Sequence, residues 1–266
     1  MNDLVLYDVL DGNVAQLTFN RPDRLNAYDT RMGNAYLDAL ERATKDPEVR
    51  SIVVTGAGRA FCAGADTSVL GGLGDGSIDV GTERTRLPQT TPLRVPKPIV
   101  AAINGPCVGY GFVQACFCDI RFAAAGAKIG TAFARRGLIA EYGTSWILPR
   151  LIGHGNAADL LLSGRTILAE EARDLGFVQR VFSPGLLMEG ALTYARELAT
   201  ASSPTSMAII KRQMLNDWVR GIQDAAVEAD SLMAASFRSP DFVEGVSSFL
   251  EKRTPDFPPL RFDWDF

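Results

Sequence analysis

Two glycine-rich segments each follow an apolar, β-branched run, and this spacing could bring main-chain N–H groups together. Residues 60–66 read AFCAGAD and follow the run 51–55 (SIVVT), while residues 104–111 read NGPCVGYG and follow the run 98–103 (PIVAAI). The apolar runs are typical of buried strands, so both segments are predicted at strand ends. Glycine permits sharp turns and lets a ligand approach bare N–H groups. Two such groups directed at one carbonyl oxygen would form an oxyanion hole, which stabilises developing negative charge.

The alternative for each segment is a tight strand-to-helix turn with no chemistry. Other motifs with glycine do not fit, because the chain lacks a dinucleotide fingerprint, a phosphate-binding P-loop and a G-x-S-x-G nucleophile elbow. The one histidine, His154, lies in residues 151–155 (LIGHG), which are predicted to join two helices. A serine hydrolase therefore has little support in the sequence.

The four cysteines show no C-x-x-C spacing, and a single histidine could not complete a zinc site, so no metal is expected. They are predicted to be reduced and buried. Cys62 and Cys107 fall inside the two glycine-rich segments, which raises the possibility of a catalytic thiol. No histidine stands near either in the sequence to lower the thiol pKa, so we disfavour this role.

Composition places the chain in the globular class. It has 266 residues, of which 47% are hydrophobic and 22% charged, with a formal net charge of -4. This charge gives no reason to expect a nucleic-acid partner. No run reaches the length of a membrane span and no basic, apolar leader opens the sequence, so we expect a cytoplasmic protein without a membrane partner.

Hydrophobic periodicity predicts a ββαβ beginning. The predicted elements are a hairpin of strands 4–9 and 14–19, a helix over 30–43, a strand over 51–55, a helix over 111–118 and a strand over 120–124. Residues 70–93 are rich in Gly, Asp, Ser, Thr and Pro and are predicted to form a long loop beside the ligand. The remainder is predicted as helices over 156–163, 169–175, 184–201, 205–235 and 240–253. Strand and helix alternation followed by helices indicates an α/β fold with a helical C-terminal region.

Four blocks of sequence resemble the enoyl-CoA hydratase/isomerase family, the crotonase superfamily. They are residues 20–27 (NRPDRLNA), 61–66 (FCAGAD), 103–120 (INGPCVGYG to CDI) and 244–257 (EG to FLEKR and Phe257). The resemblance implies a crotonase-like spiral of ββα units over 1–200 with an acyl-CoA site, and a helical oligomerisation region over 201–266. It also implies a homotrimer or a dimer of trimers. The substrate would be an acyl-CoA thioester, with coenzyme A as part of the substrate and no separate cofactor.

The same resemblance assigns roles to individual residues. The oxyanion donors would be the main-chain N–H groups of Ala65 and Tyr110, the latter at the start of a helix whose dipole would assist. The positions that would line the CoA moiety are Arg24, Leu25, Ala63, Ala65, Asp66, Thr67 and Tyr110. Lys252 would approach CoA phosphates across a subunit boundary, with a solvated lysine at a helix end as the alternative.

One departure from the family bears on the reaction. Hydration of a 2-enoyl thioester in this family uses two glutamates, and the matching positions here are Val113 and Phe133, which cannot transfer a proton. Ordinary hydration is therefore predicted to be impaired or absent.

Glu141 supplies a different carboxylate, in residues 137–144 (GLIAEYGT). It resembles the catalytic glutamate of peroxisomal-type Δ3,Δ2-enoyl-CoA isomerases, where one carboxylate removes the α-proton and returns it at the γ-carbon. An apolar pocket would raise its pKa, which suits a group that acts as both base and acid. The alternative is a loop carboxylate paired with Arg135, Arg136 or Arg150.

Isomerisation by Glu141 is the favoured reaction, and two other functions stay open. One is a hydratase or related lyase that uses Glu141 with Glu83 or Asp79, and the other is a catalytically silent acyl-CoA-binding protein. Tyr142 and Trp146 are predicted to pack the acyl pocket, or else to fill the core.

Overall fold

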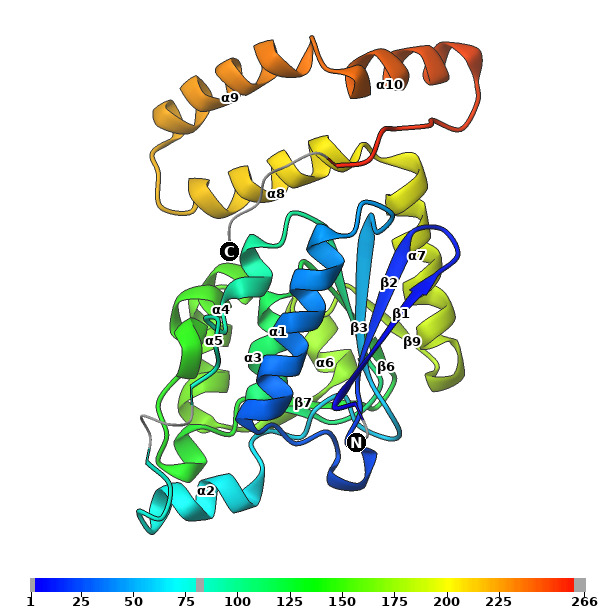
Figure 1. The fold of residues 1–266 in the computed structure, drawn as a ribbon. Helices are drawn as coiled ribbons and strands as arrows, with labels where there is room; N and C mark the ends of the chain where they lie inside the picture. Colours follow the sequence, from blue (N-terminus) through cyan, green and yellow to red (C-terminus); the bar gives the residue numbers. More distant parts are fainter. Residues whose placement is uncertain (1–2, 80–83, 261–266) are drawn as a thin grey trace.

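The computed structural model describes residues 3–79 and 84–260, and a six-stranded sheet stands at its centre (Figure 1). The strand order is β1-β2-β3-β4-β6-β9, with β1 and β2 antiparallel and the other neighbours parallel. The bounds are β1 Val5–Leu10, β2 Val14–Phe19, β3 Ser51–Gly56, β4 Ile99–Ile103, β6 Ile120–Ala124 and β9 Arg180–Phe182. The predicted hairpin and the α/β class are confirmed.

A second, three-stranded sheet and the helices surround this sheet. The small sheet has the order β5-β7-β8, with β5 Cys107–Val108, β7 Lys128–Gly130 and β8 Thr166–Leu168. The α-helices are α1 Thr30–Lys45, α2 Thr67–Gly74, α3 Tyr110–Phe117, α4 Thr144–Ile152, α5 His154–Ser163, α6 Ala169–Asp174, α7 Leu187–Ala201, α8 Pro204–Asp217, α9 Ile222–Ser236 and α10 Pro240–Glu251. Short 3-10 helices are η1 Pro22–Arg24, η2 Thr91–Arg94, η3 Ala134–Arg136, η4 Glu141–Gly143 and η5 Pro184–Leu186.

Helices cover both faces of the central sheet, which explains its unbroken apolar runs. Every residue of β3 and β4 is buried. Side chains alternate between the faces of a strand, so Ile52 and Val54 pack in the core with α1 and α3, while Val53 packs in a separate cluster with α7. Parallel strands buried on both faces read as continuous hydrophobic sequence rather than as an alternating pattern. The same burial fixes the strand ends from which both glycine-rich segments leave.

The largest differences between the predicted and observed boundaries occur at two places. The first residues of the predicted loop 70–93 belong to α2, which continues to Gly74. This helix forms because the Asp66 side chain caps its N-terminus by accepting a hydrogen bond from the Ser68 N–H, 3.1 Å away. The predicted single helix 205–235 is two helices, since α8 ends at Asp217 and α9 begins after Gly221. His154 does lie at a helix junction, between α4 and α5, as predicted.

The last three helices lie at one end of the central sheet. In Figure 1, α8, α9 and α10 form a layer beyond the end of α7, and α10 lies at the opposite end of the molecule from α2. No residue of α9 is buried. Within the described part of the chain, no helix has the length and apolar character needed to cross a membrane.

Candidate active site

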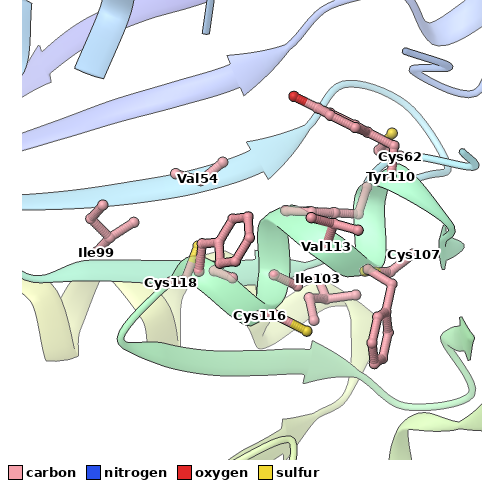
Figure 2. Close-up of a cluster of buried hydrophobic side chains, with 14 of the residues drawn as sticks. Val54, Cys62, Ile99, Ile103, Cys107, Tyr110, Val113, Cys116 and Cys118 are labelled. Carbon is pink, nitrogen blue, oxygen red and sulfur yellow. The ribbon is translucent and has the colours of Figure 1, made fainter. Parts of the chain in front are cut away.

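The two glycine-rich segments meet beside the first turn of α3. The Cys62 N–H donates to the Pro106 carbonyl at 3.0 Å, and the Val108 N–H donates to the Cys62 carbonyl at 3.0 Å. A Cβ atom at Gly111 would lie 2.2 Å from the Cys62 carbonyl oxygen, so only glycine allows this approach. Figure 2 shows Cys62 next to Tyr110 at the start of the helix. The structure thus brings together the two segments that the sequence singled out.

Ala65 lies in an extended segment that pairs with Tyr28, and the Ala65 N–H points away from Tyr28. The Tyr28 N–H donates to the Gly64 carbonyl at 2.8 Å, and the Asp66 N–H donates to the Tyr28 carbonyl at 2.7 Å. These two bonds flank Ala65, and the main-chain groups of an extended chain alternate in direction, so its N–H points to the opposite side. Within the described residues this N–H has no main-chain acceptor.

Tyr110 is the first residue of α3, where an N–H group has no acceptor inside the helix. The preceding Gly109 has φ 54° and ψ −116°, and its own N–H donates to the Gly130 carbonyl at 3.0 Å. A Cβ atom at Gly109 would lie 3.6 Å from the Gly64 Cα atom, so the residues preceding Ala65 and Tyr110 contact each other. Two main-chain donors without acceptors, one at a helix N-terminus, can together bind a carbonyl oxygen.

The cysteines of this region are packing residues. All four are free and buried. Burial raises the pKa of the Cys62 thiol to about 12 and also raises the pKa of Cys107. A thiol held protonated in this way is a poor nucleophile at neutral pH.

Glu141 is half-buried at the start of η4, and burial raises the pKa of its carboxyl group. No cation of the described chain lies within 4 Å of it, so the alternative ion pair is not formed. The three candidate arginines donate instead to main-chain carbonyl groups of Ser163, Ala132 and Trp146. An unpaired, desolvated carboxylate is poised to accept a proton.

The turn after Glu141 connects it to the glycine-rich segments. Tyr142 and Gly143 both adopt left-handed conformations, with φ 51° and 83°. The Thr144 hydroxyl donates to the Glu141 carbonyl at 2.6 Å and fixes the turn. The Tyr142 ring then meets the Tyr110 ring edge-on, with centroids 6.1 Å apart. Glu141 therefore lies in the turn that packs against the start of α3.

The two positions that hold glutamates in hydratases of this family are core positions here. Val113 is fully buried on α3 (Figure 2), and Phe133 is 3% exposed. Both belong to the main hydrophobic cluster. Neither position offers a group that could activate water.

Asp66, predicted to line the CoA moiety, has its carboxylate engaged by groups of the protein. Burial would raise its pKa, but hydrogen bonds from Ser68 and from the Arg21 guanidinium outweigh burial and lower the pKa to about 2. Arg21 lies 2.7 Å from Asp66, and the more exposed Arg24 lies 3.4 Å from it. Arg21 also donates to the Ala27 carbonyl. The sequence argument missed Arg21, although it stands in the first family block.

The other predicted CoA-binding positions divide into two groups. The Ala63 N–H donates to the Leu25 carbonyl at 3.1 Å, and Thr67 begins α2, so these residues lie with Ala65 and Arg24 on the same loops. Lys252 is exposed at the end of α10, in the layer far from α2 (Figure 1). The single chain therefore does not bring Lys252 to the other predicted site residues.

An apolar cavity of about 330 Å³ lies elsewhere, between the end of α3, α4 and α8. Its lining includes Ile147, Leu151, Met214 and Trp218, with the Lys211–Asp119 ion pair at 2.6 Å on one side. Ala65, Tyr110 and Glu141 do not line it.

Comparisons with known proteins agree with this fold. The sequence profile of the enoyl-CoA hydratase/isomerase family matches residues 10–259, and the chain belongs to that family. A 1,2-epoxyphenylacetyl-CoA isomerase from Escherichia coli is 35% identical, over 97% of this chain and 99% of that protein. The crystal structure of an enoyl-CoA hydratase, EchA12_1, from Mycobacterium marinum is 51% identical with a TM-score of 0.71, covering 82% of this chain and all of the other. An enoyl-CoA hydratase from Bacillus anthracis is 29% identical with a TM-score of 0.89, covering 96% and 99%. The predicted crotonase-like fold and the family are confirmed.

Proposed function

We propose that this enzyme moves a double bond within an acyl-CoA thioester, converting a 3-enoyl-CoA to a 2-enoyl-CoA. The observation that carries the proposal is Glu141, a half-buried carboxylate without a cationic partner in the turn that packs against Tyr110. One carboxylate suffices for this reaction, because it can act first as base and then as acid.

The thioester oxygen would accept hydrogen bonds from the Ala65 and Tyr110 N–H groups. Glu141 would take the proton from the α-carbon. The electrons of that C–H bond would form a double bond to the carbonyl carbon while the carbonyl π electrons move to the thioester oxygen, which gives a dienolate conjugated with the β,γ double bond. The same proton would return from Glu141 to the γ-carbon, which leaves the double bond between the α- and β-carbons. Removal of one donor from an oxyanion hole typically reduces kcat by about 10²–10³-fold, so the two N–H groups would carry much of the rate.

Hydration receives less support from the same residues. A hydratase needs a group that activates water in addition to one that handles the α-proton, and Val113 and Phe133 are apolar. Of the two substitutes considered, Asp79 is exposed, and Glu83 lies outside the described residues. The name of the Escherichia coli relative shows that this family includes isomerases of other CoA thioesters.

Lys252 fits a site shared between subunits. It follows the last residue of α10, at the opposite end of the molecule from α2 (Figure 1), so it would reach the CoA of a neighbouring subunit rather than that of its own. We therefore include a homotrimer or a dimer of trimers in the proposal, with α8 to α10 supplying subunit contacts. Coenzyme A would enter as part of the substrate, with no separate cofactor.

The test compares two substrates and one substitution. Wild-type protein should convert a 3-enoyl-CoA to the 2-enoyl-CoA and should add water to the latter slowly or not at all. Glu141→Gln should reduce isomerisation by at least about 10²-fold, because a positioned acid or base contributes 10²–10⁴-fold. Full turnover by this variant would exclude Glu141 as the base. Rapid hydration by the wild type would instead favour the hydratase, and tight binding without any product would indicate a binding protein.

A further inference from the structure

A buried glutamine joins the two loops of the candidate site. Gln89 is 6% exposed, and its Nε2 donates to the Tyr28 hydroxyl at 2.9 Å and to the Thr85 hydroxyl at 3.1 Å. Its Oε1 accepts from the Tyr110 hydroxyl at 2.7 Å and from Gln114 Nε2 at 3.0 Å. An amide side chain has two donors and two acceptor lone pairs, so every position on Gln89 is used.

Of the two tyrosines that Gln89 connects, Tyr110 carries one of the candidate oxyanion donors, and Tyr28 holds the residues on either side of the other donor, Ala65. The two tyrosine rings stack, with centroids 3.5 Å apart and planes inclined by 22°. The position of the Gln89 side chain therefore affects both glycine-rich segments, through Tyr28 and through Tyr110.

Gln89 is itself held in place by the segment around it. The Thr91 N–H and hydroxyl both donate to the Pro88 carbonyl, at 3.0 and 2.6 Å. A little earlier in the chain, Arg86 binds Asp38 and Glu41 on α1, each at 2.6 Å. These contacts anchor the segment to a core helix, so Gln89 has a fixed support from which to hold the tyrosines.

The side chains that bond to Gln89 form a buried polar cluster, in a place where apolar side chains could pack instead. Buried polar groups are unfavourable unless their hydrogen bonds are satisfied. Gln114, 1% exposed, keeps its own Oε1 without a partner among the described residues, while its Nε2 is given to Gln89. Departures from optimal packing of this kind are expected where a site needs a defined geometry.

We propose that Gln89 is a positioning residue that sets the separation and direction of the Ala65 and Tyr110 N–H groups through the two tyrosine hydroxyls. The proposal rests on the proposed function of those N–H groups as an oxyanion hole. It assigns to Gln89 no contact with the substrate.

The direct test replaces Gln89 by leucine, which removes all four hydrogen bonds and keeps a similar volume. The kcat for isomerisation should fall by about 10- to 100-fold, because small displacements of catalytic groups reduce rates on this scale. The KM should change less than the kcat, because hydrogen bonds to the thioester oxygen are strongest in the transition state, where its negative charge develops. Tyr110→Phe, which keeps the main-chain N–H, should reproduce part of the loss. In the Gln89→Leu background, Tyr110→Phe should add almost nothing, because both changes break the same connection.

A spectroscopic measurement separates positioning from stability. A saturated acyl-CoA, isotope-labelled at the thioester carbonyl, would be bound to each variant and its carbonyl stretching frequency compared with that in water. The wild type should lower this frequency, and Gln89→Leu should lower it less. Ser51→Ala is the matched control, because it removes a buried hydrogen bond of 2.9 Å to the Ala195 carbonyl in the α7 layer of the sheet. It should reduce the melting temperature and leave the carbonyl frequency unchanged.

The outcomes distinguish this inference from the function on which it rests. If wild-type protein binds the thioester without lowering the carbonyl frequency, the oxyanion hole itself is wrong. If the wild type lowers the frequency and Gln89→Leu retains both the lowering and the full kcat, only the role of Gln89 is overturned. Should Gln89→Leu fail to fold, Tyr110→Phe decides by the same two measurements.

Discussion

At the scale of single residues, the proposed reaction depends on one carboxylate, Glu141, whose charged form is disfavoured by burial. Glu141 lacks a cationic partner in the described chain, and burial raises its pKa above the ordinary value of 4.5. A folded-state pKa above the unfolded value means that the folded protein binds this proton more tightly. The resulting contribution to stability is present below pH 4.5 and is lost as the pH rises through the raised pKa.

Two pH-dependent results should follow from Glu141. The kcat/KM for isomerisation should rise with pH as Glu141 loses its proton, with a midpoint above 4.5. Glu141→Gln removes the ionisable group, so it should melt at or above the wild-type temperature at neutral pH while losing activity. Thermal melts and rate profiles over the same pH range provide the measurement. Glu189→Gln, a change on the exposed side of α7, is the control and should alter neither curve. A variant at position 141 that melts well below the wild type at pH 7 would show that its carboxylate stabilises the fold instead.

At the scale of helices and strands, local signals in the sequence predicted the strands that present the site. The runs 51–55 and 98–103 are buried on both faces, so their composition alone identified them. The break between α8 and α9 was missed because both helices carry similar apolar patterns and only Gly221 marks the boundary. Arg21 and Gln89 were missed for a different reason. Their partners lie 45 and 21 residues away, and no local pattern reports such contacts.

Helix α3 shows how an element transmits a constraint to the site. Its first residue is Tyr110, and its last turn is fixed by the buried Arg121. Arg121 donates to the carbonyl groups of Ala115 and Cys118 at 3.2 and 2.6 Å, and to that of Phe177 at 2.6 Å. A cation at the C-terminus of a helix is also favourable for the helix dipole.

Arg121→Lys should therefore destabilise the protein despite keeping the charge. A lysine ammonium cannot reproduce the planar geometry that serves three carbonyl groups, and a buried carbonyl left without a donor costs about 1–3 kcal/mol. Urea denaturation should show a loss of free energy of unfolding of that size. Arg173→Lys is the matched control, because Arg173 binds Asp174 at 2.9 Å on the surface and should change stability by less than about 1 kcal/mol. Equal midpoints for the two variants would contradict a structural role for Arg121.

At the scale of the whole molecule, α9 and α10 expose large apolar side chains that no other part of the described chain covers. The exposed apolar side chains of these two helices include Ile222, Val227, Val243, Phe249 and Leu250, of which Phe249 is 82% exposed. Extended apolar patches of this kind mark sites of association. Under the proposed function, a neighbouring subunit would have to bring Lys252 near CoA, because Lys252 ends α10 at the opposite end of the molecule from α2.

The assembly can be tested by placing a charge on this surface. Light scattering should give the wild type a mass three or six times that of one chain. Phe249→Glu should shift the mass toward that of a single chain, because burying an unpaired carboxylate at a subunit contact is strongly unfavourable. The KM for acyl-CoA should rise in the same variant if neighbouring subunits complete the CoA site. Leu186→Glu, at an exposed apolar residue of η5 away from α9 and α10, is the control and should leave the mass unchanged. A wild type that remains a single chain at all concentrations would remove α9 and α10 from the proposed site and leave Lys252 as a solvated helix-end residue.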